Sequence, residues 1–392
     1  MVFLPLMFGI VLGILAGLLP GLHPNALSQL LTYVQLDKFD GAVVIAASAS
    51  VNTVLSVLPA IFLFIPEETT ILSVLPGQRM VNCGDGLKAV WISGMSALIA
   101  IALLVLLVPV AFFVLPIAYQ SVRPYLGPVM LAVTGFYLLQ EKSCHKIMSA
   151  CFVFFLSGFL GWALLSSSIL HEPLFVSFLG LFALSSMAFS IDKVAIPHQR
   201  WVTDERIGKE LVIVVAVGVV LGGLADLLPA VGSPAQLATF ATPLLAIDSP
   251  SFLALTMAIS ISHLANSFVA LHTIDKARVG STAIIRELIG RPDLQTTLFF
   301  LLVVLLAAAV AVALLWILAI PLIQFLRRTN LKLLNAALFL YLVVSVLFVD
   351  GIVGLLVSIV AAAIGMLPVL LGVRRTHLMG FLIVPTLAFL LA

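Results

Sequence analysis

The stretch LLPGLHPNALSQL, residues 18–30, interrupts an apolar segment that would otherwise cross a membrane. Residues 1–17 carry no charged side chain, whereas Pro20, Gly21 and Pro24 follow within a few positions. Backbone groups that lose their helical partners cost several kcal/mol each in the hydrocarbon core of a bilayer, unless protein or water covers them. The interruption therefore predicts either a polar site inside the protein or a tightly packed hairpin.

The composition places the whole chain in a lipid bilayer. It has 392 residues, of which 62% are hydrophobic and 9% are charged, whereas soluble proteins contain roughly 25% charged residues. At roughly 20 apolar residues per crossing, we expect an all-α polytopic protein of the cell (cytoplasmic) membrane with about ten to twelve transmembrane helices. The net charge of +2 does not favour nucleic acid as a partner. The three cysteines have neither disulfide nor metal-ligand spacing, so neither a metal site nor a bound cofactor is expected.

A second stretch of the chain resembles the first. GILAGLLPGLHPNALSQLLTYVQLD, residues 13–37, aligns with GGLADLLPAVGSPAQLATFATPLLAID, residues 222–248, when one or two single-residue shifts are allowed. Three pairs of residues then coincide: Pro20 with Pro229, Pro24 with Pro234, and Asp37 with Asp248. The alignment predicts an internal duplication, with repeats over 1–200 and 201–392.

Each repeat is then expected to contain one broken or re-entrant helix, at 19–25 and at 228–236. The second break has the residues of a new helix start, because Ser233 suits the N-cap and Pro234 the first helical position. Helix N-termini present unpaired N–H groups and the positive end of a dipole, so two facing N-termini form a site for an anion, as in transporters built from repeats. Simple kinking or packing is the alternative reading of each break. The expected substrate site comprises Pro20, Gly21, His23, Pro24, Asn25, Gly232, Ser233, Pro234, Ala235 and Gln236, with Arg79 either as a further partner of the anion or as a loop anchor.

A pair of polar residues follows each break at a similar distance. Asn52-Thr53 aligns with Asn266-Ser267 inside otherwise apolar segments. Their side-chain oxygens suit a hard monovalent cation such as Na⁺, so these residues are candidates for ion coupling. Hydrogen bonding between neighbouring helices is an equally good explanation.

Asp226 lies three residues before the proline of the second break. A carboxylate inside a membrane is costly and commonly functional, so Asp226 is a candidate for coupling protons or cations. The alternative is that Asp226 lies near the membrane surface and is solvated. His263 is expected to be a satisfied histidine of the core.

The basic residues indicate a topology. They gather in the connections 66–88, 140–146, 191–209 and 273–293, which the positive-inside rule assigns to the cytoplasm. The apolar run 294–326 is too long for one crossing, and doubling back there would bring the basic residues that follow it into agreement with the rule.

At these residues the chain resembles the large membrane subunit of tripartite tricarboxylate transporters, the TctA family, in a short and divergent form. GILAGLLPGLHPNA, residues 13–26, is similar to the family's Pro-Gly motif, and PGQRMVNCGDGLKAVWISGMSALI, residues 76–99, to its Asp-Gly and Ala-rich segment. FLGLFALSSM, residues 178–187, and LPAVGSPAQLATF, residues 228–240, are weaker matches. Family members are commonly longer, and LHPN stands here in place of the usual small residues after the Pro-Gly.

The resemblance implies a secondary-active permease that takes up a small organic anion, such as a di- or tricarboxylate, with Na⁺ or H⁺ as the coupling ion. It also implies a small membrane subunit and an extracytoplasmic binding protein as partners, besides the lipid bilayer. A solitary permease and a homodimer both stay open.

Two other functions compete with this one. A transporter of a lipid phosphate, such as a polyprenyl phosphate, would use the same helix starts but would need an apolar lateral opening. A membrane-embedded enzyme is disfavoured, because the chain contains no HExxH, GxSxG or CxxC motif.

Overall fold

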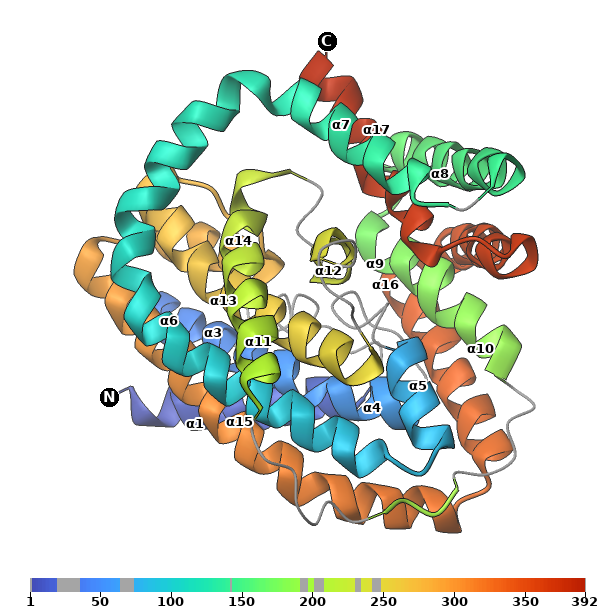
Figure 1. The fold of residues 1–392 in the computed structure, drawn as a ribbon, viewed down its shortest axis with the longest axis horizontal. Helices are drawn as coiled ribbons and strands as arrows, with labels where there is room; N and C mark the ends of the chain where they lie inside the picture. Colours follow the sequence, from blue (N-terminus) through green and yellow to red (C-terminus); the bar gives the residue numbers. More distant parts are fainter. Residues whose placement is uncertain are drawn as a thin grey trace.

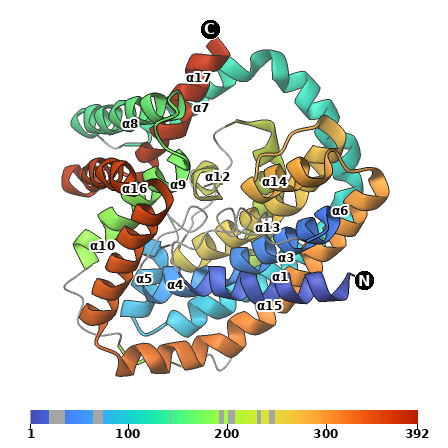
Figure 2. The same cartoon turned by 180° about the vertical axis from the view of Figure 1, so that it is seen from behind.

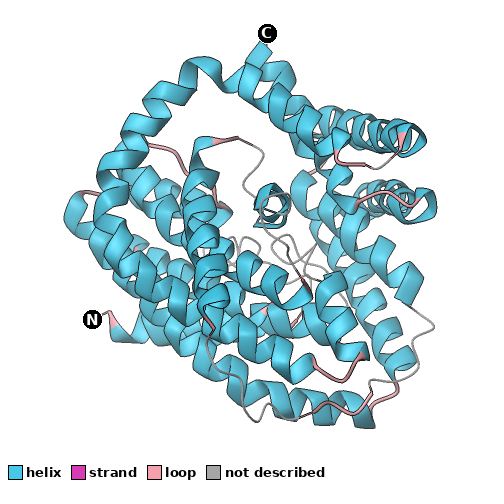
Figure 3. Ribbon diagram, viewed as in Figure 1, coloured by secondary structure: helices cyan, strands magenta, loops and turns pink. Residues whose placement is uncertain are grey.

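The computed structural model describes residues 2–19, 36–63, 74–141, 143–190, 197–200, 208–229, 234–241 and 248–391. Every regular element in these ranges is a helix (Figure 3). Seven helical segments of the described chain are long and apolar enough to cross a membrane, and three shorter apolar helices accompany them. The expectation of an all-α polytopic membrane protein is confirmed. The elements are α1 (Phe3–Leu18), α3 (Lys38–Leu55), α4 (Val57–Phe62), α5 (Val74–Asn82), α6 (Gly86–Val122), η1 (Arg123–Tyr125), α7 (Leu126–Leu139), α8 (Cys144–Leu165), α9 (Pro173–Phe178), η2 (Leu179–Leu184), α10 (Ser185–Ser190), α11 (Lys209–Leu224), η3 (Ala225–Leu227), α12 (Pro234–Ala241), α13 (Ser249–Ile274), α14 (Gly280–Ile289), α15 (Leu294–Arg328), α16 (Leu331–Leu371), η4 (Arg375–Met379) and α17 (Gly380–Leu391).

The helices pack around two main hydrophobic cores. The first bundle comprises α1, α3 to α6 and α11 to α15, and the second comprises α7 to α10, η2, α16, η4 and α17. Helices α6 and α7 pass from one bundle to the other along one edge, and α15 and α16 do so along the opposite edge (Figures 1 and 2). Each bundle therefore contains helices from both halves of the sequence, so a boundary near residue 200 does not separate two packed units.

Two enclosed helices, α3 and α13, form the centre of the first bundle. Almost all residues in the most apolar stretch of each of these helices are buried within the protein. Each begins at an aspartate N-cap, because the Asp37 side chain accepts a hydrogen bond of 3.1 Å from the Phe39 N–H and that of Asp248 one of 2.9 Å from the Ser251 N–H. Each of the two aligned aspartates thus caps the start of a central helix.

Glycines allow α1 and α11 to approach these central helices closely. A Cβ atom on Gly13 would lie 2.8 Å from the Ser48 carbonyl oxygen, and one on Gly222 would lie 2.6 Å from that of Ile259. One turn earlier in each helix, the corresponding contacts join Gly9 to Val44 and Gly218 to Leu255. Only hydrogen fits at these positions, so the backbones pack directly against one another, as is common between membrane helices.

The long apolar run in the second half does not double back. Helix α15 is continuous from Leu294 to Arg328, so that expectation is wrong. The segment contains no glycine, and its proline, Pro321, lies near the end, where a helix tolerates one without turning back on itself. The turn in this region falls instead within α16, at Gly351, whose φ of 61° and ψ of −154° suit only glycine.

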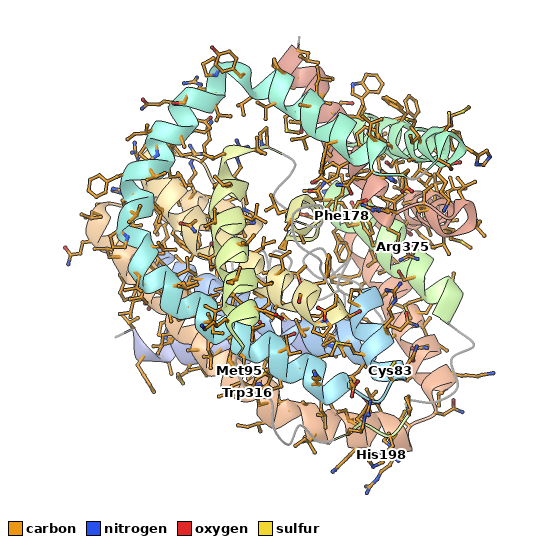
Figure 4. All side chains as sticks on the ribbon, viewed as in Figure 1. Cys83, Met95, Phe178, His198, Trp316 and Arg375 are labelled. Carbon is orange, nitrogen blue, oxygen red and sulfur yellow. The ribbon has the colours of Figure 1, made fainter. Side chains whose placement is uncertain are left out.

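Two connections that the positive-inside rule assigns to the same side contact one another. The Arg200 side chain pairs with Asp85 at 2.9 Å, and the Gly86 N–H donates a 2.7 Å hydrogen bond to the Gln199 side chain. Cys83 and His198 accordingly lie at the same end of the molecule (Figure 4). These contacts agree with the assignment of both segments to the cytoplasmic face.

Candidate functional site

Both expected helix breaks begin in the same way. Helix α1 ends at Leu18 and η3 ends at Leu227, and each is followed by a leucine in extended conformation. Leu19 has φ −101° and ψ 104°, and Leu228 has φ −106° and ψ 120°. Each leucine precedes a proline, whose ring disfavours helical conformation in the residue before it. The remaining first-break residues, Pro20, Gly21, His23, Pro24 and Asn25, and Gly232 and Ser233 of the second break, lie outside the described residues.

After the second break the chain resumes as α12, which starts at Pro234. This helix packs against α11 and α13, and Pro234 and Gln236 are buried. Ala235 lies in the first turn. The carbonyl oxygen of Gln236 accepts a 3.1 Å hydrogen bond from the hydroxyl of Tyr137, which belongs to the second bundle. The helix after the break therefore lies where the two bundles meet.

Asp226, at the start of this break, is completely buried. Its Oδ1 atom lies 3.6 Å from Nε2 of His263, which projects from the middle of α13. Neither carboxylate oxygen, nor the Nε2 atom, has a hydrogen-bond partner among the described residues. The solvated alternative for Asp226 is therefore wrong. His263 lies in the core as expected, and its ring faces the Asp226 carboxylate.

Arg278 lies in the connection between α13 and α14. Its positive charge acts on the Asp226 carboxylate, more weakly than His263 does. The Nε atom of Arg278 is buried, and it too has no hydrogen-bond partner in the described part of the chain. Sequence reasoning missed Arg278, because it occurs in a basic connection where an arginine reads as a topological signal.

The polar residues of the central helices divide into bonded and unbonded groups. Asn266 donates to the carbonyl and hydroxyl oxygens of Ser262, at 2.9 and 3.1 Å. Ser267 donates to the Leu264 carbonyl, and Thr53 to that of Ala49. These bonds match the alternative in which such residues stabilise helices.

Asn52 is different, because its buried Oδ1 atom has no hydrogen-bond partner in the described ranges. The glycine contacts also align the sequences of α3 and α13. Gly13 contacts Ser48 and Gly222 contacts Ile259, so Ser48 corresponds to Ile259. The same offset in residue number relates Asp37 to Asp248, and it aligns Asn52 with His263. The alignment of Asn52 with Asn266 is therefore out of register by three residues, because leucine-rich segments offer no marker for the shift.

Comparison with known proteins adds the decisive observation. Residues 3–380 match the model of a family described as the tripartite tricarboxylate transporter TctA family. This chain belongs to the TctA family. An uncharacterized protein of Methanocaldococcus jannaschii is 26% identical to it over 346 residues, which cover 85% of this chain and 84% of that protein. No solved structure matches the chain. The resemblance seen at the Pro-Gly motif is confirmed, and it extends over nearly the whole sequence.

In this TctA chain, Arg79 does not join the cluster around Asp226. It is exposed in the last turn of α5, and no ion pair or hydrogen bond links its side chain to Asp226 or His263. Its exposure fits the loop-anchor reading. Within the described ranges, no group of three or more His, Cys, Asp or Glu side chains is arranged to hold a metal ion.

Proposed function

We propose that this TctA chain is a secondary-active permease of the cytoplasmic membrane for a small organic anion of the di- or tricarboxylate type. Membership of a transporter family supports the general activity. The anion site is formed where the two broken helices face each other, and transport is coupled to a proton or a cation. Since the family is one of transporters, the chain acts as a permease and not as an enzyme.

One observation carries this proposal: buried polar groups beside the second break have no hydrogen-bond partner among the described residues. Asp226 and His263 bring a carboxylate and an imidazole together in the interior of an apolar protein, and the Nε atom of Arg278 is also buried without a hydrogen-bond partner among the described residues. Buried polar groups in folded proteins are nearly always hydrogen-bonded, so such a cluster indicates a place for water, an ion or a substrate. The guanidinium of Arg278 suits a substrate carboxylate, because its donors match the two oxygens.

The anion site draws on both halves of a duplicated chain. Three matched features support the duplication: the extended leucines before Pro20 and Pro229, the glycine contacts of α1 and α11, and the aspartate caps of α3 and α13. Each feature depends on residue types that local backbone geometry demands. They are therefore stronger support than aligned leucines.

The family description also bears on partners. A tripartite transporter has further components, so a small membrane subunit and an extracytoplasmic binding protein are the partners we propose for this chain.

The lipid-phosphate alternative would need an apolar lateral opening at the breaks. The groove lined by apolar α8 residues between Ile147 and Phe159 lies in the second bundle and gives that alternative no support at Asp226.

The test is binding of citrate, used as a tricarboxylate probe, to the purified full chain. Replacing Ser233 and Pro234 together by alanine, or Pro24 and Asn25 together, should abolish binding while thermal unfolding in detergent stays cooperative. Arg278→Gln should weaken citrate binding at least about tenfold, which is the worth of one charge-assisted hydrogen bond.

A matched control replaces Ser167 and Ser168, in the connection after α8, by alanine. This variant should bind citrate as the unaltered chain does. Undiminished citrate binding by both break variants would refute the site, and no citrate binding by the unaltered chain would refute a tricarboxylate substrate.

A further inference from the structure

The buried Asp226 carboxylate and the Nε2 atom of His263 have no hydrogen-bond partner among the described residues. A charged carboxylate that is fully buried and makes no hydrogen bonds costs several kcal/mol. The imidazole Nε2 at 3.6 Å is too distant for a normal hydrogen bond but near enough to share a proton after a small movement. A proton held between the two groups satisfies both, since it either neutralises the acid or charges the histidine.

Few other titratable or charged groups of the described residues face this pair. From α13 there is His263 itself, and from the connection after α13 there is Arg278. From α6, Tyr119 packs against Leu227, the neighbour of Asp226. On α11, Gly222 lies against the backbone of His263 and Gly223 against Asn266, and the charged residues Lys209 and Glu210 lie in its first turn, far from the pair.

The charge of this cluster depends on a single proton. Without it, the Asp226 carboxylate cancels the charge of Arg278, and the cluster is neutral overall. With it, the cluster carries one net positive charge. An anion is therefore bound more tightly when the proton is present, and by linkage the proton is bound more tightly when the anion is present.

The ligand set favours a proton over a metal cation. Hard cations such as Na⁺ prefer several oxygen ligands, whereas this pair offers one carboxylate and one imidazole nitrogen. The positive charge of Arg278, which acts on the carboxylate, opposes a second fixed cation. A proton needs only the two atoms that the structure brings together.

We propose that Asp226 and His263 form the proton-binding site through which this permease couples anion uptake to a proton gradient. The proposal rests on the proposed function and names its coupling ion. A proton from one side of the membrane is taken up between Oδ1 of Asp226 and Nε2 of His263. It crosses with the anion and is released on the other side, and no covalent bond other than to the proton is made or broken.

The described residues of the first half show no counterpart of this pair. Gly17 is the residue of the first half that aligns with Asp226, and it packs against Asn52 on α3. Neither glycine nor asparagine titrates, so we propose one such proton site within the described part of the chain. Coupling is then expected at one proton for each anion transport step.

The direct test uses the full chain in proteoliposomes with labelled citrate. An inward proton gradient should drive citrate accumulation, and Asp226→Asn should remove that accumulation while leaving citrate exchange at equal pH. Asp248→Asn is the matched control, because it also removes a carboxylate but at the exposed cap of α13, where asparagine caps equally well. Its citrate accumulation should equal that of the unaltered chain. Gradient-driven accumulation by Asp226→Asn at the unaltered level would overturn the proposal.

A second measurement does not depend on transport. Infrared difference spectra of the purified protein between acid and alkaline pH should show a protonated-carboxyl band that is lost in Asp226→Asn and shifted in His263→Gln. If the unaltered chain moves no citrate, the proposed substrate fails while these spectra still decide the proton site. Identical carboxyl bands in the unaltered chain and Asp226→Asn would overturn it, and so would a band in His263→Gln identical to the unaltered one.

Discussion

The hydroxyl of Tyr137 donates a 3.1 Å hydrogen bond to the carbonyl oxygen of Gln236. Tyr137 lies on α7 in the second bundle, whereas Gln236 lies on the short helix that follows the second break. The bond therefore ties the proposed anion site of one bundle to a buried side chain of the other. Any movement between the bundles during transport has to strain or break it.

Tyr137→Phe should lower the free energy of unfolding by about 1 kcal/mol, because a buried carbonyl loses one of its partners. The measurement is thermal or denaturant unfolding of the purified protein in detergent. Tyr125→Phe, at a position where the side chain is 63% exposed, serves as the control and should leave stability unchanged. Equal stability of both variants would show that the bond contributes nothing to docking.

Alanine at the close helix contacts should be destabilising in both halves alike. Gly13→Ala and Gly222→Ala each place a methyl group less than 3 Å from a backbone oxygen of the neighbouring helix. Overpacking of this kind costs about 1–3 kcal/mol. Gly135→Ala on α7 is the matched control, because a Cβ atom there has no neighbour within 4 Å. A loss of stability for Gly135→Ala as large as for the other two would contradict the packing argument.

The loss of folding stability at acid pH should depend on Glu141. Burial raises the pKa of this carboxyl, but the backbone hydrogen bond from Arg374 and the bond and charge of His377 outweigh burial, so its pKa lies below 4.5. The carboxylate therefore binds protons more readily in the unfolded chain. Its contribution to stability is complete above about pH 4.5 and is lost as the pH falls through the folded-state pKa.

The check on Glu141 is the unfolding midpoint as a function of pH. Glu141→Gln should lower the midpoint at neutral pH and flatten its decline in acid. Glu287→Gln, on the exposed face of α14, should leave the whole profile unchanged. A profile for Glu141→Gln that runs parallel to that of the unaltered chain would remove Glu141 from this role.

The kink of α16 should depend on Gly351. Alanine at a φ of 61° and ψ of −154° costs on the order of 1–3 kcal/mol in backbone strain. The kink also aims the Asp350 carboxylate at the N–H groups of His171 and Glu172. Gly351→Ala should thus lower the unfolding temperature, whereas Ile352→Ala, whose side chain is 63% exposed, should not. Unchanged stability of Gly351→Ala would mean that α16 straightens at little cost.

Much of the candidate site could be anticipated from local chemistry. The helix breaks were predicted from proline, and the described backbone does become extended at Leu19 and Leu228. The start of α12 at Pro234 and the caps at Asp37 and Asp248 follow from the same kind of rule. Each depends on interactions within a few residues, which are readable in the printed sequence.

Other expectations failed where the answer depends on distant packing. The doubling back of 294–326 was inferred from length alone, but a glycine-free apolar segment keeps its helical bonds and continues straight as α15. The register of Asn52 against Asn266 was inferred from alignment, whereas glycine contacts with another helix set it three residues differently. Arg278 was overlooked, because its electrostatic effect on Asp226 depends on how the chain folds.

The sequence by itself determined that this chain is a helical membrane protein of the TctA family with two proline-interrupted segments, because hydrophobicity, proline geometry and helix capping act over short distances. Only the tertiary structure decided that each bundle mixes helices from both halves, and that a buried aspartate faces a histidine 37 positions away. Those pairings depend on which glycines let which helices approach, and apolar sequences of similar composition do not encode that choice locally.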